Sequence, residues 1–313
     1  MIARGDRHPV RRHAIVTGAA GFIGQRLVAH LLDAGWEVVA VDLRPSDGVE
    51  SLVLDVTVPG ALTPLLDGEA TVFHLAASAD IRASVEDPRA DFEVNVAGLF
   101  EVLESARHRQ SRVIFLSTAS IYDSDNPLPL KERDCPRPRS PYAAGKLAGE
   151  GYCYAYHRCY GMDVRVARLF NAYGAGMTRF VIHDLIRKIQ RDPHTLSILG
   201  DALQVRDFLY VDDAARALAL IAERGVAGED YNVASGIPVR VRDLALLIAR
   251  LMGHPDIRLV ATGQSFAGDT SRWYADISKI QALGFAPRVS LEEGLRRTIA
   301  WLDAHRPSRA VAP

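Results

Sequence analysis

Two side chains that could move a proton stand four residues apart in the sequence, Tyr142 and Lys146. Pro141 suits the first turn of a helix, and a helix over 142–160 would place both side chains on one face. A free tyrosine has a pKa of about 10 and is a poor base at neutral pH. A neighbouring ammonium group favours the phenolate and lowers that pKa, so the pair could act as a general acid and base toward a substrate hydroxyl. Thr118, at the end of a predicted strand, could hydrogen-bond the same oxygen and orient it.

A tyrosine and a lysine at this spacing are common by chance. The pair indicates catalysis only in combination with a glycine-rich stretch near the start of the chain. Residues 14–16 predict a buried strand and residues 25–34 an amphipathic helix. Gly18, Gly21 and Gly24 lie between them. Glycine there lets the chain turn tightly, lets the backbone approach a pyrophosphate and lets the helix pack close to the strand. We therefore predict a dinucleotide-binding turn; an ordinary strand–turn–helix unit is the alternative.

Two aspartates extend this prediction to the rest of a dinucleotide. Asp42 ends a second apolar run and lies about 20 residues past the turn, where a carboxylate would bind the adenosine ribose hydroxyls. A 2′-phosphate would meet its negative charge, so Asp42 favours NAD over NADP, although Arg44 weakens this preference. Asp55 follows a short strand over 52–54 and could accept a hydrogen bond from the adenine amino group, or be an ordinary loop aspartate.

Strands and helices alternate through the first half of the chain. This alternation implies right-handed crossovers and an α/β fold with a doubly wound parallel sheet, a Rossmann fold. After Gly176 the alternation is lost, which predicts a smaller C-terminal α+β lobe. We assign 1–172 to the first domain, with 206–236 returning to it, and 173–205 and 237–313 to the second. The remaining predicted strands cover 37–41, 70–75, 112–116 and 164–169, and a single long helix covers 91–110.

Composition sets limits on the partners and the compartment. Apolar residues make up 48% of the 313 residues and the net charge is −1, so nothing favours nucleic-acid or membrane binding. The sequence contains no apolar run of membrane-spanning length and no secretory signal, and we expect a cytoplasmic protein. Cys153, His157 and Cys159 do not share one helix face, so no metal site is predicted. His74 is expected to be a packed core residue.

Several stretches together resemble the extended short-chain dehydrogenase/reductases, in particular the nucleotide-sugar epimerase/dehydratase family. The resemblance spans the chain from Gly18 to about Ala300. The matching stretches are Thr17–Gly24, His74–Ala77, Asn95–Gly98, Ser117–Thr118, Ser140–Lys146, Arg168–Asn171, Arg206–Phe208 and Tyr274–Lys279.

The resemblance implies a role for each matching position. Thr118, Tyr142 and Lys146 match the family's catalytic triad, with NAD as the cofactor. Phe170 would lie near the nicotinamide. The other positions that match cofactor contacts, apart from Tyr142 and Lys146 themselves, are Gly18, Gly21, Phe22, Ile23, Gly24, Asp42, Asp55, Val56, Leu75, Ala76, Ala77, Asn95 and Ser117.

Substrate contacts are implied in the same way. Asn171, Arg206 and Arg272 match residues that hold the diphosphate of a sugar nucleotide, and arginines suit a diphosphate as bidentate donors. Taken alone, each arginine would more often be part of a surface ion pair. Arg179 lies in a region that lines the sugar pocket in relatives, where it could meet a carboxylate or remain on a helix surface. The family also dimerises, through the helices that hold Asn95 and Tyr142, so a homodimer is implied.

The residues after Thr118 discriminate among the family's reactions. Dehydratases of the family carry Asp-Glu directly after this threonine, and sugar-acid decarboxylases carry a glutamate two residues after it. This chain has Ala119 and Ser120 there, and a small hydroxyl resembles the 4-epimerases, including those that act on glucuronate. Trp273 falls at a position where, in the family, the size of the side chain decides whether an N-acetyl group on sugar C2 can fit. The large indole therefore argues against N-acetylhexosamines as substrates.

The sequence therefore predicts a 4-epimerase of a UDP-hexose or UDP-hexuronic acid. Ser120 and the diphosphate-binding residues would contact the substrate, and the NAD would be regenerated in each cycle. Two alternatives stay open within the family: a dehydratase or a 4-ketoreductase of antibiotic or glycan sugar synthesis. Asp42 speaks against a reductase, which should favour NADP. A non-catalytic NAD-binding sensor is the alternative of another class, and it would not need the Tyr142–Lys146 pair.

Overall fold

The computed structural model describes residues 12–46, 49–263 and 272–305, and these residues form two compact units. The first unit contains residues 1–121, 138–168 and 218–231. The second contains 122–137, 169–217 and 232–313. The sequence-based boundaries place four segments with the first domain that group with the second unit here: 122–137, 169–172, 206–217 and 232–236. Among the described residues, no helix combines the length and the apolar character needed to cross a membrane.

The first unit is built on a seven-stranded sheet, which confirms the predicted doubly wound fold. Its strand order is β10-β6-β5-β4-β1-β2-β3, so the chain begins in the middle and winds outward in both directions. Strand β1 pairs in parallel with β2 and β4, and the pairs β2–β3 and β4–β5 are also parallel. The strands are β1 (His13–Thr17), β2 (Glu37–Asp42), β3 (Ser51–Val53), β4 (Thr71–His74), β5 (Arg112–Thr118), β6 (Val164–Leu169) and β10 (Asp230–Val233).

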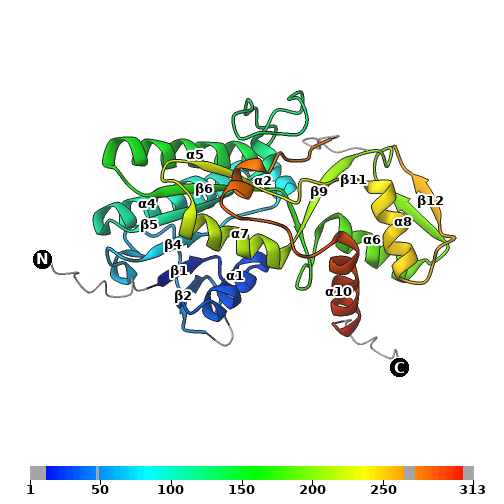
Figure 1. Cartoon of the computed structure of the whole chain (residues 1–313), viewed down its shortest axis with the longest axis horizontal. Helices are drawn as coiled ribbons and strands as arrows, with labels where there is room; N and C mark the ends of the chain where they lie inside the picture. Colours follow the sequence, from blue (N-terminus) through cyan, green and yellow to red (C-terminus); the bar gives the residue numbers. More distant parts are fainter. Residues whose placement is uncertain (1–11, 47–48, 264–271, 306–313) are drawn as a thin grey trace, which may run out of the picture. The chain divides into compact units, whose positions relative to one another are not determined.

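Helices cover both faces of this sheet. In Figure 1, α4 (Gly98–Arg109) and α5 (Pro141–Tyr160) lie on one face and α1 (Phe22–Asp33) lies on the other. The apolar strand residues and the inner faces of α4 and α5 form one buried cluster that includes Leu99, Phe115 and Tyr156. The unit also contains α2 (Ile81–Glu86), α3 (Pro88–Phe92), short 3-10 turns at Thr63–Leu65 and Ala119–Ile121, and the part of α7 (Val211–Arg224) from Leu218 onward.

The helix predicted over 91–110 is not continuous. The chain forms α3, then a π-helical segment over Glu93–Ala97, and then α4. A π segment inserts one extra residue into the helical hydrogen-bond pattern and is often found at functional sites. Apolar periodicity does not register a single inserted residue, so the sequence predicted one long helix. The segment contains Asn95, one of the predicted cofactor contacts.

The second unit contains two small sheets with helices packed against them. The three-stranded sheet has the order β11-β9-β7 and the two-stranded sheet pairs β12 with β8. Asn232 is fully buried and accepts a hydrogen bond from the Tyr122 hydroxyl at 2.7 Å while donating to the Leu130 carbonyl at 3.0 Å. The elements are α6 (Phe180–Arg191), α8 (Val241–Leu251), α9 (Ser278–Ala282), α10 (Leu291–Ala304), β7 (Asn171–Tyr173), β8 (Thr195–Ile198), β9 (Val205–Tyr210), β11 (Pro238–Arg240) and β12 (Arg258–Ala261).

Candidate functional site

The parallel register brings the predicted site residues of the first unit to one edge of its sheet. Thr17 is paired with Val41 on one side and His74 on the other, and His74 is paired with Phe115. These four residues form a row near the carboxyl ends of β1, β2, β4 and β5. Open parallel sheets bind ligands at this edge. The residues directly after Thr17, Val41 and His74, and the last two residues of β5, Ser117 and Thr118, therefore begin the candidate site.

The glycine-rich turn follows β1 directly. Gly18 has φ +72°, a conformation that favours glycine, and a Cβ atom there would lie 2.7 Å from the backbone of Leu75 and Ala76. A Cβ on Gly24 would collide with the carbonyl oxygen of Gly18. Helix α1 begins after Gly21, whose position provides no capping side chain for the first amides of the helix. The turn thus has the close packing and uncapped helix start that a pyrophosphate site requires.

Asp42 and Asp55 both accept hydrogen bonds from backbone amides. Asp42 Oδ2 accepts a hydrogen bond from the amide of Ala20, in the glycine-rich turn, at 3.0 Å. Its other oxygen accepts from the Arg44 amide at 3.3 Å. Asp55 Oδ1 accepts from the amide and the hydroxyl of Thr57 at 2.9 and 2.8 Å. Asp42 is therefore oriented at the end of β2 by the same turn that would hold the phosphates.

His74 is fully buried, as predicted, and links β4 to β1. Its Nδ1 lies 2.9 Å from Thr17 Oγ1, which also accepts a hydrogen bond from the Ala76 amide at 3.3 Å. Burial, with a smaller contribution from the charge of Lys146, lowers the pKa of His74 to about 3. At neutral pH the imidazole is uncharged, so Thr17 Oγ can donate to Nδ1 while it accepts from Ala76. This pair fixes the start of the Leu75–Ala77 stretch.

Asn95 is held rigidly in the π-helical segment. Its Nδ2 donates to the Ser78 carbonyl at 2.9 Å and to Asp91 Oδ1 at 2.8 Å. Its Oδ1 is buried and has no hydrogen-bond partner within the described parts of the chain. Burial raises the pKa of the Asp91 carboxyl, while Asn95 and the charge of Lys146 oppose this. An unsatisfied buried acceptor is costly unless a ligand or water satisfies it.

The predicted proton-transfer pair, Tyr142 and Lys146, is positioned by the start of α5. Ser140 caps the helix by accepting a hydrogen bond from the Ala143 amide at 3.2 Å, and Pro141 occupies the first position. Tyr142 is partly exposed in the first turn, and Lys146 is 2% exposed one turn later. Both therefore lie on one face of α5, as the spacing predicts.

Lys146 is fixed at the end of β5. Its Nζ donates to the Leu116 carbonyl at 3.0 Å and lies 4.9 Å from the centre of the Phe115 ring. Burial lowers its pKa to about 8, while the nearby acidic groups, chiefly Asp91, oppose this shift. The ammonium form still predominates at neutral pH. A charged amine held at this point can stabilise a phenolate on the same helix face.

Thr118 and Ser120 are in direct contact after the end of β5. The Thr118 hydroxyl accepts from the Ser120 amide at 3.1 Å and donates to Ser120 Oγ at 3.2 Å. Thr118 is 9% exposed and Ala119 is 2% exposed. Two small hydroxyl groups therefore stand together where dehydratases and decarboxylases are expected to carry carboxylates.

A buried ionic network that was not predicted lies behind this pair. Glu150, one turn after Lys146 on α5, accepts a hydrogen bond from the Ser117 hydroxyl at 2.5 Å. Arg168 on β6 donates to both carboxylate oxygens of Glu150, with the shortest contact at 2.7 Å, and to Asp230 at 2.6 Å. The i,i+4 spacing of Lys146 and Glu150 was visible in the sequence, but the partner Arg168 was not.

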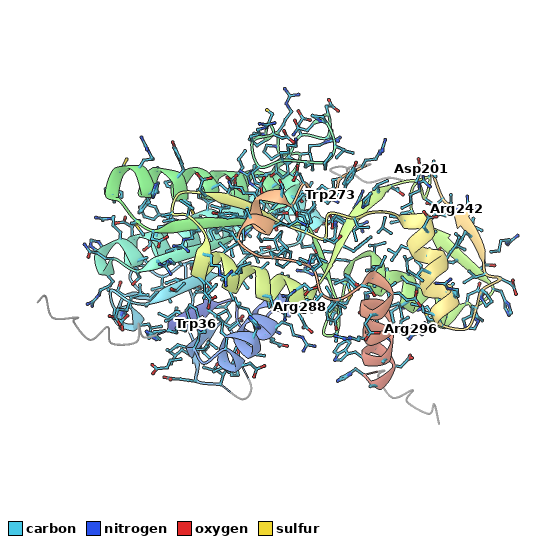
Figure 2. The ribbon with its side chains drawn as sticks, in the orientation of Figure 1. Trp36, Asp201, Arg242, Trp273, Arg288 and Arg296 are labelled. Atoms are coloured by element: carbon cyan, nitrogen blue, oxygen red, sulfur yellow. The ribbon has the colours of Figure 1, made fainter. Side chains whose placement is uncertain are left out.

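In the second unit, a row of aromatic residues ends at Arg206. Tyr122 and Phe170 have ring centres 6.4 Å apart, and Phe170 and Trp273 6.5 Å apart. The Arg206 guanidinium lies 5.3 Å above the Trp273 ring and donates to its own strand at the Val205 carbonyl. Trp273 is labelled in Figure 2. Its indole nitrogen is buried and has no hydrogen-bond partner in the described part of the chain.

Asn171 and Asp207 connect β7 and β9 with the neighbouring loops. Asn171 Nδ2 donates to the Asp207 carbonyl at 2.9 Å. The buried Asp207 carboxylate accepts from the amide and the hydroxyl of Ser235 and from the amides of Gly236 and Ala275. Burial raises the pKa of Asp207, and these hydrogen bonds oppose the shift. Asp207 therefore has a structural role, fixing the strand that presents Arg206.

The structure does not place Arg272 beside Arg206. Arg272 is paired with Val205, so these two side chains share the face of β9 opposite to that of Arg206. On that face, Arg272, Val205 and Tyr274 line a pocket of about 840 Å³. Arg179, which precedes α6, lies with its guanidinium 4.8 Å from the Phe180 ring.

Residues of the first unit fit the NAD that the sequence predicts. The glycine-rich turn would hold the pyrophosphate, and Asp42 the adenosine ribose. The unsatisfied Asn95 Oδ1 would accept a hydrogen bond from a ligand at this edge of the sheet. These features rest on observed backbone geometry and buried polar atoms, independent of any relative.

Comparison with known proteins agrees with this geometry. The model of the NAD dependent epimerase/dehydratase family matches residues 14–234. The chain belongs to this family. A UDP-glucuronate 4-epimerase of Thermodesulfobacterium geofontis is 33% identical over 310 residues, which cover 92% of this chain and 95% of that one. A dTDP-glucose 4,6-dehydratase of Streptomyces griseus is also 33% identical, over 314 residues, 94% of this chain and 95% of that one.

Solved structures are similar over nearly the whole chain. MoeE5 in complex with UDP-glucuronic acid and NAD has a TM-score of 0.85 and 34% identity, covering 93% of this chain and 99% of that one. The UDP-glucose 4-epimerase of Thermus thermophilus in complex with NAD has a TM-score of 0.83 and 30% identity, covering 94% and 99%. The family and the Rossmann fold predicted from the motifs are thereby confirmed, and NAD is the cofactor of the family.

Proposed function

We propose that this family member is an NAD-dependent 4-epimerase of a nucleotide-activated sugar, with a UDP-hexose or a UDP-hexuronic acid as substrate. The observation that carries the proposal is the sheet edge after β5. There a buried ammonium group, Lys146, shares a helix face with Tyr142, while Thr118 and Ser120 provide only hydroxyl groups. This set can move the proton of an alcohol while bound NAD would accept and return the hydride, but among these four residues there is no carboxylate for eliminating water.

The proposed proton transfer uses three side chains of the first unit. The Tyr142 phenolate accepts the proton of the C4 hydroxyl of the sugar, and Lys146 stabilises that phenolate. The Thr118 hydroxyl, which donates to Ser120 Oγ and accepts from the Ser120 amide in this structure, would turn its proton to the same sugar oxygen when the substrate binds. When bound, NAD supplies the hydride acceptor for sugar C4 and returns the hydride. After the keto-sugar rotates, Tyr142 gives the proton back to the oxygen, now on the other face.

The cofactor and substrate contacts predicted from the sequence remain part of the proposal. Gly18, Gly21 and Gly24 would bind the pyrophosphate of NAD, and Asp42 would bind its ribose. In the second unit, Asn171 and Arg206 would bind the diphosphate of the sugar nucleotide. Arg206 suits this role because its guanidinium is held against Trp273, which limits its conformational freedom.

The choice of a UDP-sugar is supported by the relatives. Several are named UDP-glucose or UDP-glucuronate epimerases, and MoeE5 has been solved with UDP-glucuronic acid as well as with UDP-glucose. The second candidate function is a dTDP-glucose 4,6-dehydratase, because relatives with that name match equally well. Ala119 and Ser120 argue against it, because neither can act as the acid or base of an elimination.

A homodimer is part of the proposal. Helices α3 to α5 expose large apolar side chains that a partner could cover: Phe92 is 54% exposed, Phe100 39% and Tyr152 42%. Phe100 and Tyr152 touch edge to face across α4 and α5, with ring centres 6.1 Å apart. Their surfaces thus form one patch rather than isolated residues.

A product assay tests the proposed function. The purified protein would be incubated, without added cofactor, with UDP-glucose, UDP-glucuronate and dTDP-glucose, and the products analysed by mass spectrometry and proton NMR. An isobaric product with an inverted C4 proton signal is expected from one of the UDP-sugars. A product lighter by one water would refute the epimerase and support the dehydratase. The Tyr142→Phe variant is the control for turnover by this site.

A further inference from the structure

Glu150 connects the two catalytic segments of the first unit. It lies one helical turn after Lys146 on α5. Its carboxylate accepts a hydrogen bond from the hydroxyl of Ser117, the residue before Thr118. It is 8% exposed, and Arg168 donates to both of its oxygens. A buried carboxylate with three well-placed donors is rigid, because its hydrogen bonds restrain it from several directions.

Arg168 lies between two carboxylates of this network. Its Nη2 atom is 2.7 Å from the carboxylate of Glu150 and 2.6 Å from that of Asp230. One guanidinium thus faces two carboxylates. Lys146 is a buried cation one turn away from Glu150 on the same helix, and Asp91 faces it as well. Glu150 and Asp91 thus both lie near the buried ammonium group.

We propose that Glu150 is a positioning residue for proton transfer, which orients Thr118 through Ser117 and holds Lys146 in its charged form. The inference rests on the proposed function, because it assigns a role toward the same proton-transfer pair. Glu150 itself touches neither the substrate nor the reacting atoms. It acts through a hydrogen bond on one catalytic residue and through its charge on the other.

The effect of the charge follows from the groups around Lys146. Asp91 faces it from α3, Tyr142, Glu150 and Cys153 share its helix, and the neutral His74 faces it from β4. Among these, Asp91, Cys153 and Glu150 favour the ammonium form, with Asp91 having the largest effect and Glu150 the smallest. Removing the charge of Glu150 should lower the pH at which Lys146 loses its proton. For charges one helical turn apart, the expected shift is on the order of one pH unit.

Three variants separate positioning from charge. Glu150→Gln removes the charge, and we expect the alkaline limb of the kcat profile to move to lower pH by about one unit. Ser117→Ala removes the hydrogen bond but keeps the charge, and we expect kcat to fall roughly tenfold with no movement of that limb. Asp163→Asn is the matched control, because Asp163 also pairs with Arg165 and Arg112 but at the opposite end of β6. Its pH profile should coincide with that of the wild type.

Two results would overturn the inference: a Glu150→Gln profile that coincides with that of Asp163→Asn, or an unchanged kcat in Ser117→Ala. If Glu150→Gln fails to fold, the Ser117→Ala result decides alone.

Thermal unfolding provides a readout that does not need turnover. Lys146 has a pKa of about 8 in the fold against an ordinary value of 10.5, so its contribution to Tm rises with pH between these values. In Glu150→Gln this rise should begin at lower pH, and in Asp163→Asn it should not. An unmoved rise in Glu150→Gln would contradict the charge effect. If the wild type turns over no sugar nucleotide, the proposed function fails, and this measurement still tests the link between Glu150 and Lys146.

Discussion

The turn after β1 allows a sharp test, because the chain offers a matched pair of glycines. Gly18 and Gly35 have nearly the same left-handed conformation, with φ +72° and +78°. A Cβ atom on Gly35 would meet nothing within 4 Å. A Cβ on Gly18 would lie 2.7 Å from backbone atoms of Leu75 and Ala76, closer than real Cβ atoms approach. Alanine at the two sites therefore has the same conformational cost but a different steric one.

The expected free energies follow from this difference. Alanine in the left-handed region costs about 1–2 kcal/mol, part of which is offset by the lower entropy of the unfolded chain. Gly35→Ala should therefore destabilise the protein by about 1 kcal/mol. Gly18→Ala adds an overpacking cost of about 1–3 kcal/mol, and because the contact is with backbone it cannot be relieved by a rotamer change. We expect a total loss of about 3 kcal/mol for Gly18→Ala.

Urea unfolding and NAD binding together measure the prediction. The midpoint for Gly18→Ala should fall clearly below that for Gly35→Ala at an unchanged m-value. Gly18→Ala should also lose NAD binding, measured by calorimetry, because the strain lies in the turn proposed to hold the pyrophosphate. Equal stability of the two variants would refute the steric argument. Full NAD binding by Gly18→Ala would refute the assignment of the turn.

Three further outcomes are expected. Tyr142→Phe should lower kcat by about 10²- to 10⁴-fold while NAD binding, measured by calorimetry, stays unchanged; equal loss of both would contradict its role in proton transfer. His74 has a pKa of about 3 in the fold against its ordinary 6.5, so the stability of the wild type should fall as the pH drops from 6.5 toward 3. His74→Gln, which can still accept from Thr17, should show a shallower decline in urea titrations, and an identical slope would contradict the assignment. Asn232→Ala removes three side-chain hydrogen bonds, two of them buried, and should cost about 3 kcal/mol. It should also open the segment 122–137 to limited proteolysis, unlike the wild type.

Much of the fold was predictable because its elements have strong local signals. The helix predicted over 142–160 is observed as α5, one residue longer at its start, and the strand predicted over 164–169 is observed with the same bounds. Pro141 marks the start of the helix and every residue of the strand is buried, so local pattern and tertiary burial agree. The strand β7 was not predicted, because its three residues gain their conformation from pairing with β9, which lies far away in the sequence.

The candidate site also contains features that were predictable from the sequence and features that were not. The glycine-rich turn and the Tyr142–Lys146 pair depend on residues close in sequence, and their types and spacing could be interpreted directly. Placing Arg272 on the face opposite to Arg206 depends on the pairing of Arg272 with Val205, which no local pattern determines. The hydrogen bonds of Asn95 likewise depend on where the π-helical segment begins. The groups that hold catalytic residues in place thus come from tertiary contacts.

At this edge of the sheet, the buried Lys146 carries a positive charge whereas the buried His74 does not. His74 and Lys146 both lie against Phe115, since the His74 ring stacks on it with centres 6.1 Å apart and the Lys146 amine lies 4.9 Å from its centre. Both are buried, yet Lys146 has acidic neighbours in Asp91 and Glu150, whereas His74 has the neutral hydroxyl of Thr17. Burial without a counter-charge keeps the imidazole neutral, and the charge of Lys146 reinforces this. Between about pH 3 and pH 8, Lys146 is therefore charged and His74 is not. In the proposed mechanism, the Tyr142 phenolate then has Lys146, rather than His74, as its stabilising cation, and we expect the acidic neighbours of Lys146 to influence the pH range of activity.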